Sequence, residues 1–181
     1  FRSELPDRET ILESLHRPNS RRMFSLRQAL VAGISEEEIF AVSSIDPWFI
    51  RQVRDIVDME KRICNFGLAN DMTTANAALA DMLREAKEYG FSDRQLAEMW
   101  KLPEAEIRHM RTAMKVQPTY YLVDTCAAEF EAYTPYFYST YERGEEIKVE
   151  DRRKVLILGG GPNRIGQGIE FDYCCCHASF A

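Results

Sequence analysis

Apolar residues recur every three or four positions between residues 8 and 116, a spacing that predicts a run of amphipathic helices. Ser35 and Glu38 form a capping-box pattern that marks the start of one short helix, which is expected to run to about Val42. We therefore expect this part of the chain to be a helical bundle.

The longest helix is expected to begin at Asp46 and Pro47. The aspartate can accept a hydrogen bond at the N-cap, and proline fits the next position because no amide hydrogen is needed there. Gly67 is expected to end the helix, since glycine readily adopts the left-handed conformation. Trp48 should anchor the first turn. One buried stripe is predicted for its apolar residues, which are Phe49, Val53, Ile56, Val57, Ile63 and Cys64.

Three further helices are predicted before the pattern changes. The first lies between Thr74 and Tyr89, the second is capped by Ser92, and the third opens at Pro103. Pro118 should end this helical region.

The composition changes after residue 119. Residues 133–141 are rich in tyrosine and predict a packed aromatic connector, whereas residues 143–153 are charged and indicate a solvated turn or linker. We place a domain boundary in this linker, which divides the chain into residues 1–150 and 151–181.

Residues 154–158 form a short apolar run with β-branched members, followed by three glycines and a predicted helix from about Gly166. This order predicts strand, turn and helix. A parallel strand needs neighbours that come only after crossover connections, and the chain ends at Ala181 before one could follow. The expected fold class is therefore mainly α, an irregular helical bundle followed by a truncated βα unit. We interpret the chain as a piece of a longer protein.

The glycine-rich loop at residues 159–168 is similar to a phosphate-binding turn. Arg164 stands where a dinucleotide fingerprint needs its third glycine, and Gln167 and Gly168 replace the lysine and hydroxyl residue of a Walker loop. A tight structural turn is an equally good interpretation.

Charge and cysteine content narrow the possible functions. A formal net charge of -6 opposes broad binding to nucleic acid or to anionic membranes. Five cysteines without regular spacing favour reduced thiols, and hence a cytoplasmic setting. Cys174, Cys175 and Cys176 would point in different directions around a helix, so even beside His177 they favour packing over a zinc site. The spacing predicts no catalytic, cofactor or metal residues.

Residues 92–116 have the rhythm of a helix-turn-helix, so DNA binding is an alternative. Five basic and four acidic residues give this segment a net charge of only +1. Helices that face DNA usually concentrate positive charge for phosphate contacts. The balance favours a packing role for the motif.

Five segments carry a resemblance to a known family. They read VDTCAAEF at 123–130, YSTYE at 138–142, IDPWF at 45–49, GFSD at 90–93 and GGGPNRIGQGIEFDY at 159–173. Together they resemble the large subunit of carbamoyl phosphate synthetase, and the last segment is the most specific. The resemblance implies an oligomerisation domain followed by the start of the second synthetase half, in its pre-ATP-grasp domain.

The resemblance also implies a parent enzyme with two ATP-grasp halves. It makes carbamoyl phosphate, for arginine and pyrimidine biosynthesis, from bicarbonate, two ATP and ammonia that a glutaminase small subunit releases. ATP, magnesium or manganese, and potassium serve the parent. None of those sites maps onto this chain, so we expect no cofactor here and no activity from the chain alone.

The remaining candidates concern transport and assembly. Ile165, Gly166 and Gly168 resemble residues that line the family's internal passage for ammonia and carbamate. The expected partners are other large subunits, the small subunit and the two flanking halves, with no nucleic acid or membrane. By residue type, the interface candidates are Arg21, Arg22, Trp48 and Trp100. Ordinary surface charge and core aromatics are an equally good interpretation of these four.

Overall fold

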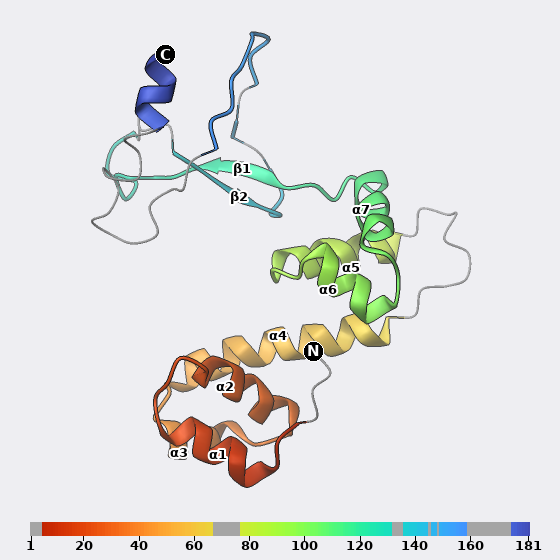
Figure 1. The fold of residues 1–181 in the computed structure, drawn as a ribbon, viewed down its shortest axis with the longest axis vertical. Helices are drawn as coiled ribbons and strands as arrows, with labels where there is room; N and C mark the ends of the chain where they lie inside the picture. Colours follow the sequence, from red (N-terminus) through yellow and green to blue (C-terminus); the bar gives the residue numbers. More distant parts are fainter. Residues whose placement is uncertain (1–4, 67–76, 132–135, 145, 148, 159–174) are drawn as a thin grey trace. The chain divides into compact units, whose positions relative to one another are not determined.

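The computed structural model describes residues 5–66, 77–131, 136–144, 146–147, 149–158 and 175–181. It divides into one unit that ends at Glu146 and another that begins at Ile147. In the described part of the first unit, helices alternate with short loops before one antiparallel strand pair (Figure 1). The helices are α1 (Arg8–His16), α2 (Arg22–Val31), α3 (Glu36–Ser43), α4 (Pro47–Asn65), α5 (Ala77–Glu88), α6 (Asp93–Trp100) and α7 (Glu104–Ala113).

The mainly helical fold class is confirmed, and the predicted helix starts are found. Ser35 caps α3 by accepting a hydrogen bond from the Glu38 amide at 3.2 Å. The Asp46 carboxylate caps α4 by accepting from the Trp48 amide at 2.8 Å, with Pro47 in the first turn. These local signals succeed because each needs only neighbours in sequence.

A first hydrophobic cluster holds α1, α2, α3 and the beginning of α4 together, and Figure 1 shows these helices in red and orange. Its buried members are Ile11, Leu15, Leu26, Ala29, Leu30, Ile34, Ile39, Ile50 and Val57. Each of these residues is at most 4% exposed. This burial accounts for the short helices, which would be marginal alone in water.

A second hydrophobic cluster gathers the end of α4 with α5, α6 and α7. Its buried members are Met59, Ile63, Leu79, Leu83, Ala86, Phe91, Leu96, Ala97, Ile107, Met110 and Val116. Tyr141, from the segment after the helices, is half-buried against this cluster. The cluster therefore connects the helical region to the aromatic connector.

Helix α4 contributes to both clusters, which corrects the prediction of a single buried stripe. Ile50 and Val57 enter the first cluster, whereas Met59 and Ile63 enter the second. Phe49, Ile56 and Cys64, expected to be buried, are exposed. The prediction failed because one 19-residue helix packs on different neighbours along its length, and periodicity cannot distinguish two partly buried faces from one.

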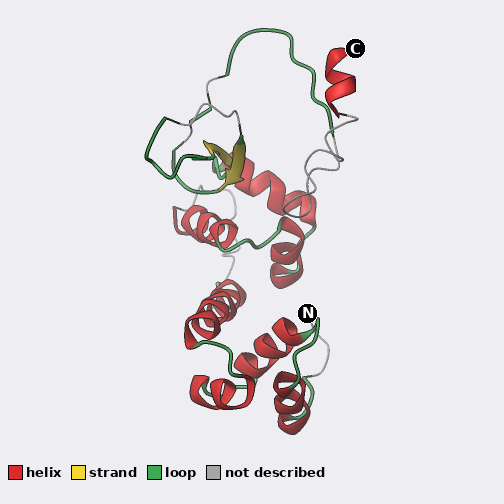
Figure 2. Cartoon of the chain, turned by 90° about the vertical axis from the view of Figure 1, so that its left-hand side faces the viewer, coloured by secondary structure: helices red, strands yellow, loops and turns green. Residues whose placement is uncertain are grey.

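The aromatic connector forms one strand of an antiparallel pair that the sequence pattern did not predict. Strand β1 (Thr119–Leu122) pairs antiparallel with β2 (Phe137–Thr140), which places Tyr121 opposite Tyr138. Their rings are stacked, with centroids 5.9 Å apart. Figure 2 shows these strands in yellow against the red helices. Cross-strand aromatic pairs of this kind stabilise a short ladder.

In the second unit, the expected strand at residues 154–158 is absent from the described structure, which is a correction. Val155, Leu156 and Leu158 are 85–90% exposed. A strand exists only as part of a hydrogen-bonded ladder, and the described residues offer this segment no partner. Residues 175–180 are helical, and the glycine-rich loop at 159–168 lies outside the described residues.

Candidate functional site

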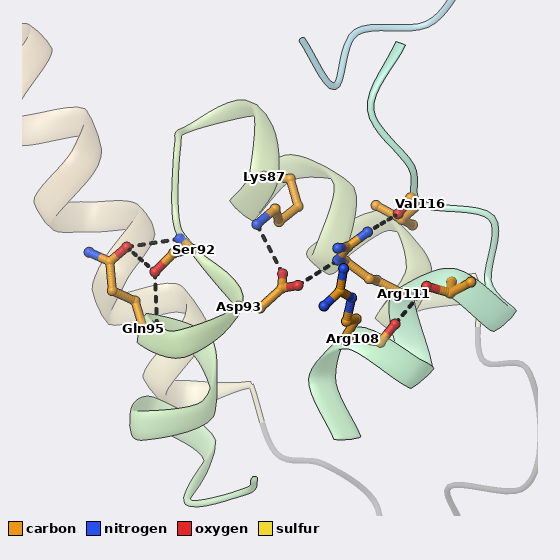
Figure 3. Close-up of polar contacts among 8 residues, drawn as sticks. Lys87, Ser92, Asp93, Gln95, Arg108, Arg111 and Val116 are labelled. Atoms are coloured by element: carbon orange, nitrogen blue, oxygen red, sulfur yellow. Dashed lines mark hydrogen bonds and ion pairs between the residues drawn. The ribbon is translucent and has the colours of Figure 1, made fainter. Parts of the chain in front are cut away.

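Three charged side chains meet where α5, α6 and α7 come together (Figure 3). Asp93, in the first turn of α6, accepts from Lys87 Nζ at 3.0 Å and from Arg111 Nε at 2.7 Å. The three side chains are only 12%, 8% and 13% exposed, respectively. One carboxylate therefore links three helices through two largely buried ion pairs.

The electrostatics of Asp93 favour its charged form. Burial raises the pKa of its carboxyl group, but hydrogen bonds from Arg111 and Lys87, with their positive charges, outweigh that effect and hold the pKa below its ordinary value. Asp93 is therefore a carboxylate at neutral pH. This triad is structural, because both carboxylate oxygens of Asp93 already accept hydrogen bonds from side chains of the same unit.

The triad also reaches the segment that follows the helices. Lys87 Nζ lies 5.1 Å from the centre of the Tyr141 ring, a cation–π distance. Arg111 Nη1 donates to the Val116 carbonyl at 3.4 Å, just before β1. These contacts fix the exit from α7 and the end of β2 to the second cluster.

The α6–α7 pair is the segment that had suggested DNA binding, and several of its polar side chains are used internally. Ser92 and Gln95 form a full capping box at the start of α6 (Figure 3). Arg111 is paired with Asp93, whereas the exposed Arg108 guanidinium has no partner among the described residues. Nothing in this arrangement supports the DNA-binding alternative, and it accounts for the motif by helix packing.

Two of the four interface candidates have partners within the chain. Trp100 Nε1 donates to the Ile63 carbonyl at 2.9 Å, and its ring packs beside Phe66 against the second cluster. Arg22 donates from Nε to the Leu15 carbonyl at 3.0 Å and from Nη2 to the Ser43 carbonyl. These contacts give both residues a role inside the fold.

The other two interface candidates lie at the surface. Trp48 is 54% exposed and makes an edge-to-face contact with Phe49, which is 56% exposed. The Arg21 side chain is exposed at the start of α2. Its backbone amide donates to the Asn19 side chain at 2.8 Å. The expectation that Trp48 anchors the first turn of α4 finds no support in burial, because more than half of this side chain is exposed.

A groove of about 760 Å³ runs between α2 and α4. Phe24 and Val31 line it from α2, and Val57 lines it from α4. An ion pair crosses the groove, because Arg27 Nη2 contacts both carboxylate oxygens of Glu60, at 2.6 and 2.7 Å. Its walls are thus largely apolar, with the charged groups already paired.

The described residues provide no metal site and do not include the predicted passage-lining residues. Across the described ranges, no three His, Cys, Asp or Glu side chains are grouped to hold a metal ion. Ile165, Gly166 and Gly168, the passage-lining candidates, lie outside the described residues, as does Cys174. In the part of the chain that the structure describes, no helix is long and apolar enough to cross a bilayer.

Sequence reasoning missed the Lys87–Asp93–Arg111 triad, although it noted the capping signal at Ser92. Lys87, Asp93 and Arg111 lie on three different helices, so periodicity along one helix cannot relate them. An aspartate in the first turn of a helix is adequately explained by the helix dipole alone. Only the packing of three helices reveals its second use.

Two models of known protein families match this chain. A family model described as the carbamoyl-phosphate synthetase large chain oligomerisation domain matches residues 1–115, which include α1 to α7. The chain belongs to this family. A second model, the carbamoyl phosphate synthase preATP-grasp domain, matches residues 151–181.

Similar proteins have the same name in distant organisms. The carbamoyl phosphate synthase large chain of Synechocystis is 50% identical over 178 residues, that of Archaeoglobus fulgidus 49% over 173, and that of Rhodopirellula baltica 48% over 177. These alignments cover 96–98% of this chain but 16% of each relative. The chain thus corresponds to a small part of each large chain.

Proposed function

We propose that this chain serves as a scaffold and assembly segment of a carbamoyl phosphate synthetase large subunit. In this role its helices join two ATP-grasp halves and mediate association between large subunits. The match of residues 1–115 to a domain described by oligomerisation is the observation that carries the proposal. The chemistry belongs to the rest of the parent protein.

The structure supports a scaffold in two respects. Helix α4 is common to both hydrophobic clusters, so one continuous element connects them. The triad and Tyr141 then attach the connector to the second cluster. A segment that must hold a fixed path between flanking domains benefits from such rigid links, because inter-domain motion is otherwise the default.

The proposed parent reaction forms carbamoyl phosphate from bicarbonate, two ATP and ammonia supplied by a glutaminase small subunit, with magnesium or manganese and potassium, in the cytoplasm. The passage for its intermediates would use Ile165, Gly166 and Gly168. Glycine suits such a lining, since it carries no side chain that could narrow the bore.

Sedimentation equilibrium of the 181-residue chain tests the assembly role. We expect the mean mass to rise above that of the 21.0 kDa monomer as the concentration increases into the high micromolar range. A chain that stays strictly monomeric throughout would contradict the proposal. The absorbance of the chain's two tryptophans and eight tyrosines is sufficient to follow its distribution in the cell.

A further inference from the structure

We propose that two copies of this chain associate through an antiparallel pairing of helix α4, along the stripe formed by Trp48, Phe49, Gln52 and Ile56. This inference rests on the proposed function, because it names the surface through which the oligomerisation domain would self-associate. We call these four residues the α4 stripe.

The α4 stripe is the uncovered half of a face that is buried elsewhere in the same helix. Trp48, Gln52, Ile56, Met59 and Ile63 follow one another at intervals of four, four, three and four residues, which places them on one face of α4. Met59 and Ile63 are at most 1% exposed in the second cluster. Trp48 and Ile56 are 54% and 42% exposed, so the same apolar face continues without cover in the first half of the helix.

The stripe is complementary to itself when two copies run antiparallel. With Gln52 of one copy on Gln52 of the other, Trp48 and Ile56 lie four residues to either side, so each Trp48 meets the second copy's Ile56. A two-fold axis makes this contact occur twice. Phe49, at the edge of the stripe, extends the apolar contact around both ends.

The charges at the rim agree with this register. Arg51 and Asp55 are four residues apart, so they share one edge of α4. At a rise of about 1.5 Å per residue, the pairing brings Arg51 to about 3 Å along the axis from Asp55 of the second copy, and this attraction occurs twice. The two Arg51 side chains are equally close along the axis, so one like-charge contact opposes the two opposite-charge ones. Asp55 has no ion-pair partner among the described residues, and Arg51 has only a 3.9 Å contact with Glu36, whose closer partner is Arg54 at 2.7 Å.

The small size of the stripe sets the expected affinity. Stable interfaces use roughly 20–30 residues from each partner, many more than this stripe provides. Association through it should therefore be weak and concentration-dependent. Trp48 and Phe49, on either side of the central Gln52 pair, still supply aromatic contacts of the kind that contribute most to binding energy.

The first test substitutes the stripe in the 181-residue chain and measures association by sedimentation equilibrium. Trp48→Asp and Ile56→Glu should each raise the dissociation constant at least about tenfold, since each buries a charge against an apolar side chain. Phe24→Asp is the matched control, because Phe24 is 69% exposed but lies on the α2–α4 groove. Circular dichroism checks that every variant remains helical.

The second test uses charge exchange between chains. Arg51→Asp and Asp55→Arg should each weaken self-association about tenfold through like charges. Mixing the two variants restores both opposite-charge pairs, so the mixed dimer should return to within about threefold of the wild-type affinity. Labelling one variant at its N-terminal amine allows fluorescence-detected sedimentation to follow the mixture. Such rescue cannot arise within a single chain.

The outcomes separate the two proposals. A wild-type chain that remains monomeric overturns the proposed function and the α4 pairing together. A wild-type chain that associates, but is unaffected by the stripe variants and shows no rescue on mixing, overturns the α4 pairing alone. Loss of association in the Phe24→Asp control, with the stripe variants unaffected, would place the interface in the α2–α4 groove instead.

Discussion

At the scale of single residues, Asp93 has the largest structural consequence. Its carboxylate compensates two cations whose side chains are 8% and 13% exposed, so its loss leaves both of them desolvated and unpaired. A buried charge without its partner is far more costly than a missing surface ion pair.

We predict that Asp93→Asn lowers the free energy of unfolding by about 3 kcal/mol at pH 7. Urea unfolding followed by circular dichroism measures this change. Asp58→Asn is the matched control, because the Asp58–Lys61 pair has side chains 53% and 57% exposed. The control should change stability by less than about 0.5 kcal/mol. Equal effects at both positions would show that the triad is not effectively buried.

We also predict that the stability lost in Asp93→Asn depends on pH. The folded-state pKa of Asp93 lies below its unfolded value, so this carboxylate contributes stability above about pH 4 and loses it as the pH falls through the folded pKa. The difference between wild type and Asp93→Asn should therefore be constant near neutrality and shrink in acid. A difference that grows below pH 4 would contradict the assigned direction of the shift.

Residue-level signals explain much of what could be predicted. The caps at Ser35, Asp46 and Ser92 involve bonds across two or three positions, and the structure contains all three. The partners of Trp100 and Arg22 lie 37 and up to 21 positions away, and no local pattern encodes them. Residue type alone therefore identified exposed Trp48 and half-buried Trp100 as the same kind of candidate.

At the scale of elements, α4 divides into parts with different surroundings. Its first half packs one face on the first cluster, and its second half packs another face on the second cluster. An amphipathic pattern indicates which residues are apolar, but which of them become buried depends on helices elsewhere in the chain. For the same reason, the expected strand at residues 154–158 could not be verified by its composition, since a strand is defined by its neighbour.

Three isoleucines of α4 should respond differently to truncation. Ile50→Ala and Ile63→Ala each remove a fully buried side chain and should lower the free energy of unfolding by about 3 kcal/mol. Ile56→Ala should cost less than about 1 kcal/mol, because that side chain is 42% exposed. Urea unfolding at low micromolar concentration, where weak association is absent, measures all three. A large loss at Ile56 would mean that its face is covered within one chain.

At the scale of the whole molecule, α4 makes the two hydrophobic clusters depend on each other. Val57 belongs to the first cluster and Met59 to the second, so only Asp58 separates them along the helix. Helix formation is cooperative, and an uninterrupted helix transmits the order of one cluster to the other. The clusters should therefore unfold together despite having separate sets of buried residues.

Breaking α4 at Asp58 should separate the two clusters. Proline there removes a backbone hydrogen bond and clashes with the preceding turn, at a cost of about 3 kcal/mol. The chain's two tryptophans report on different parts, because Trp48 lies in the first turn of α4 and Trp100 packs against the second cluster. In Trp48→Phe and Trp100→Phe backgrounds, fluorescence should give coincident urea midpoints for the native helix and distinct midpoints after Asp58→Pro.

Asp58→Ala, which keeps the helix, should leave the midpoints coincident. Distinct midpoints in the unbroken chain would instead mean that α4 joins the clusters in space without coupling their stability, and the proposed scaffold role requires that coupling.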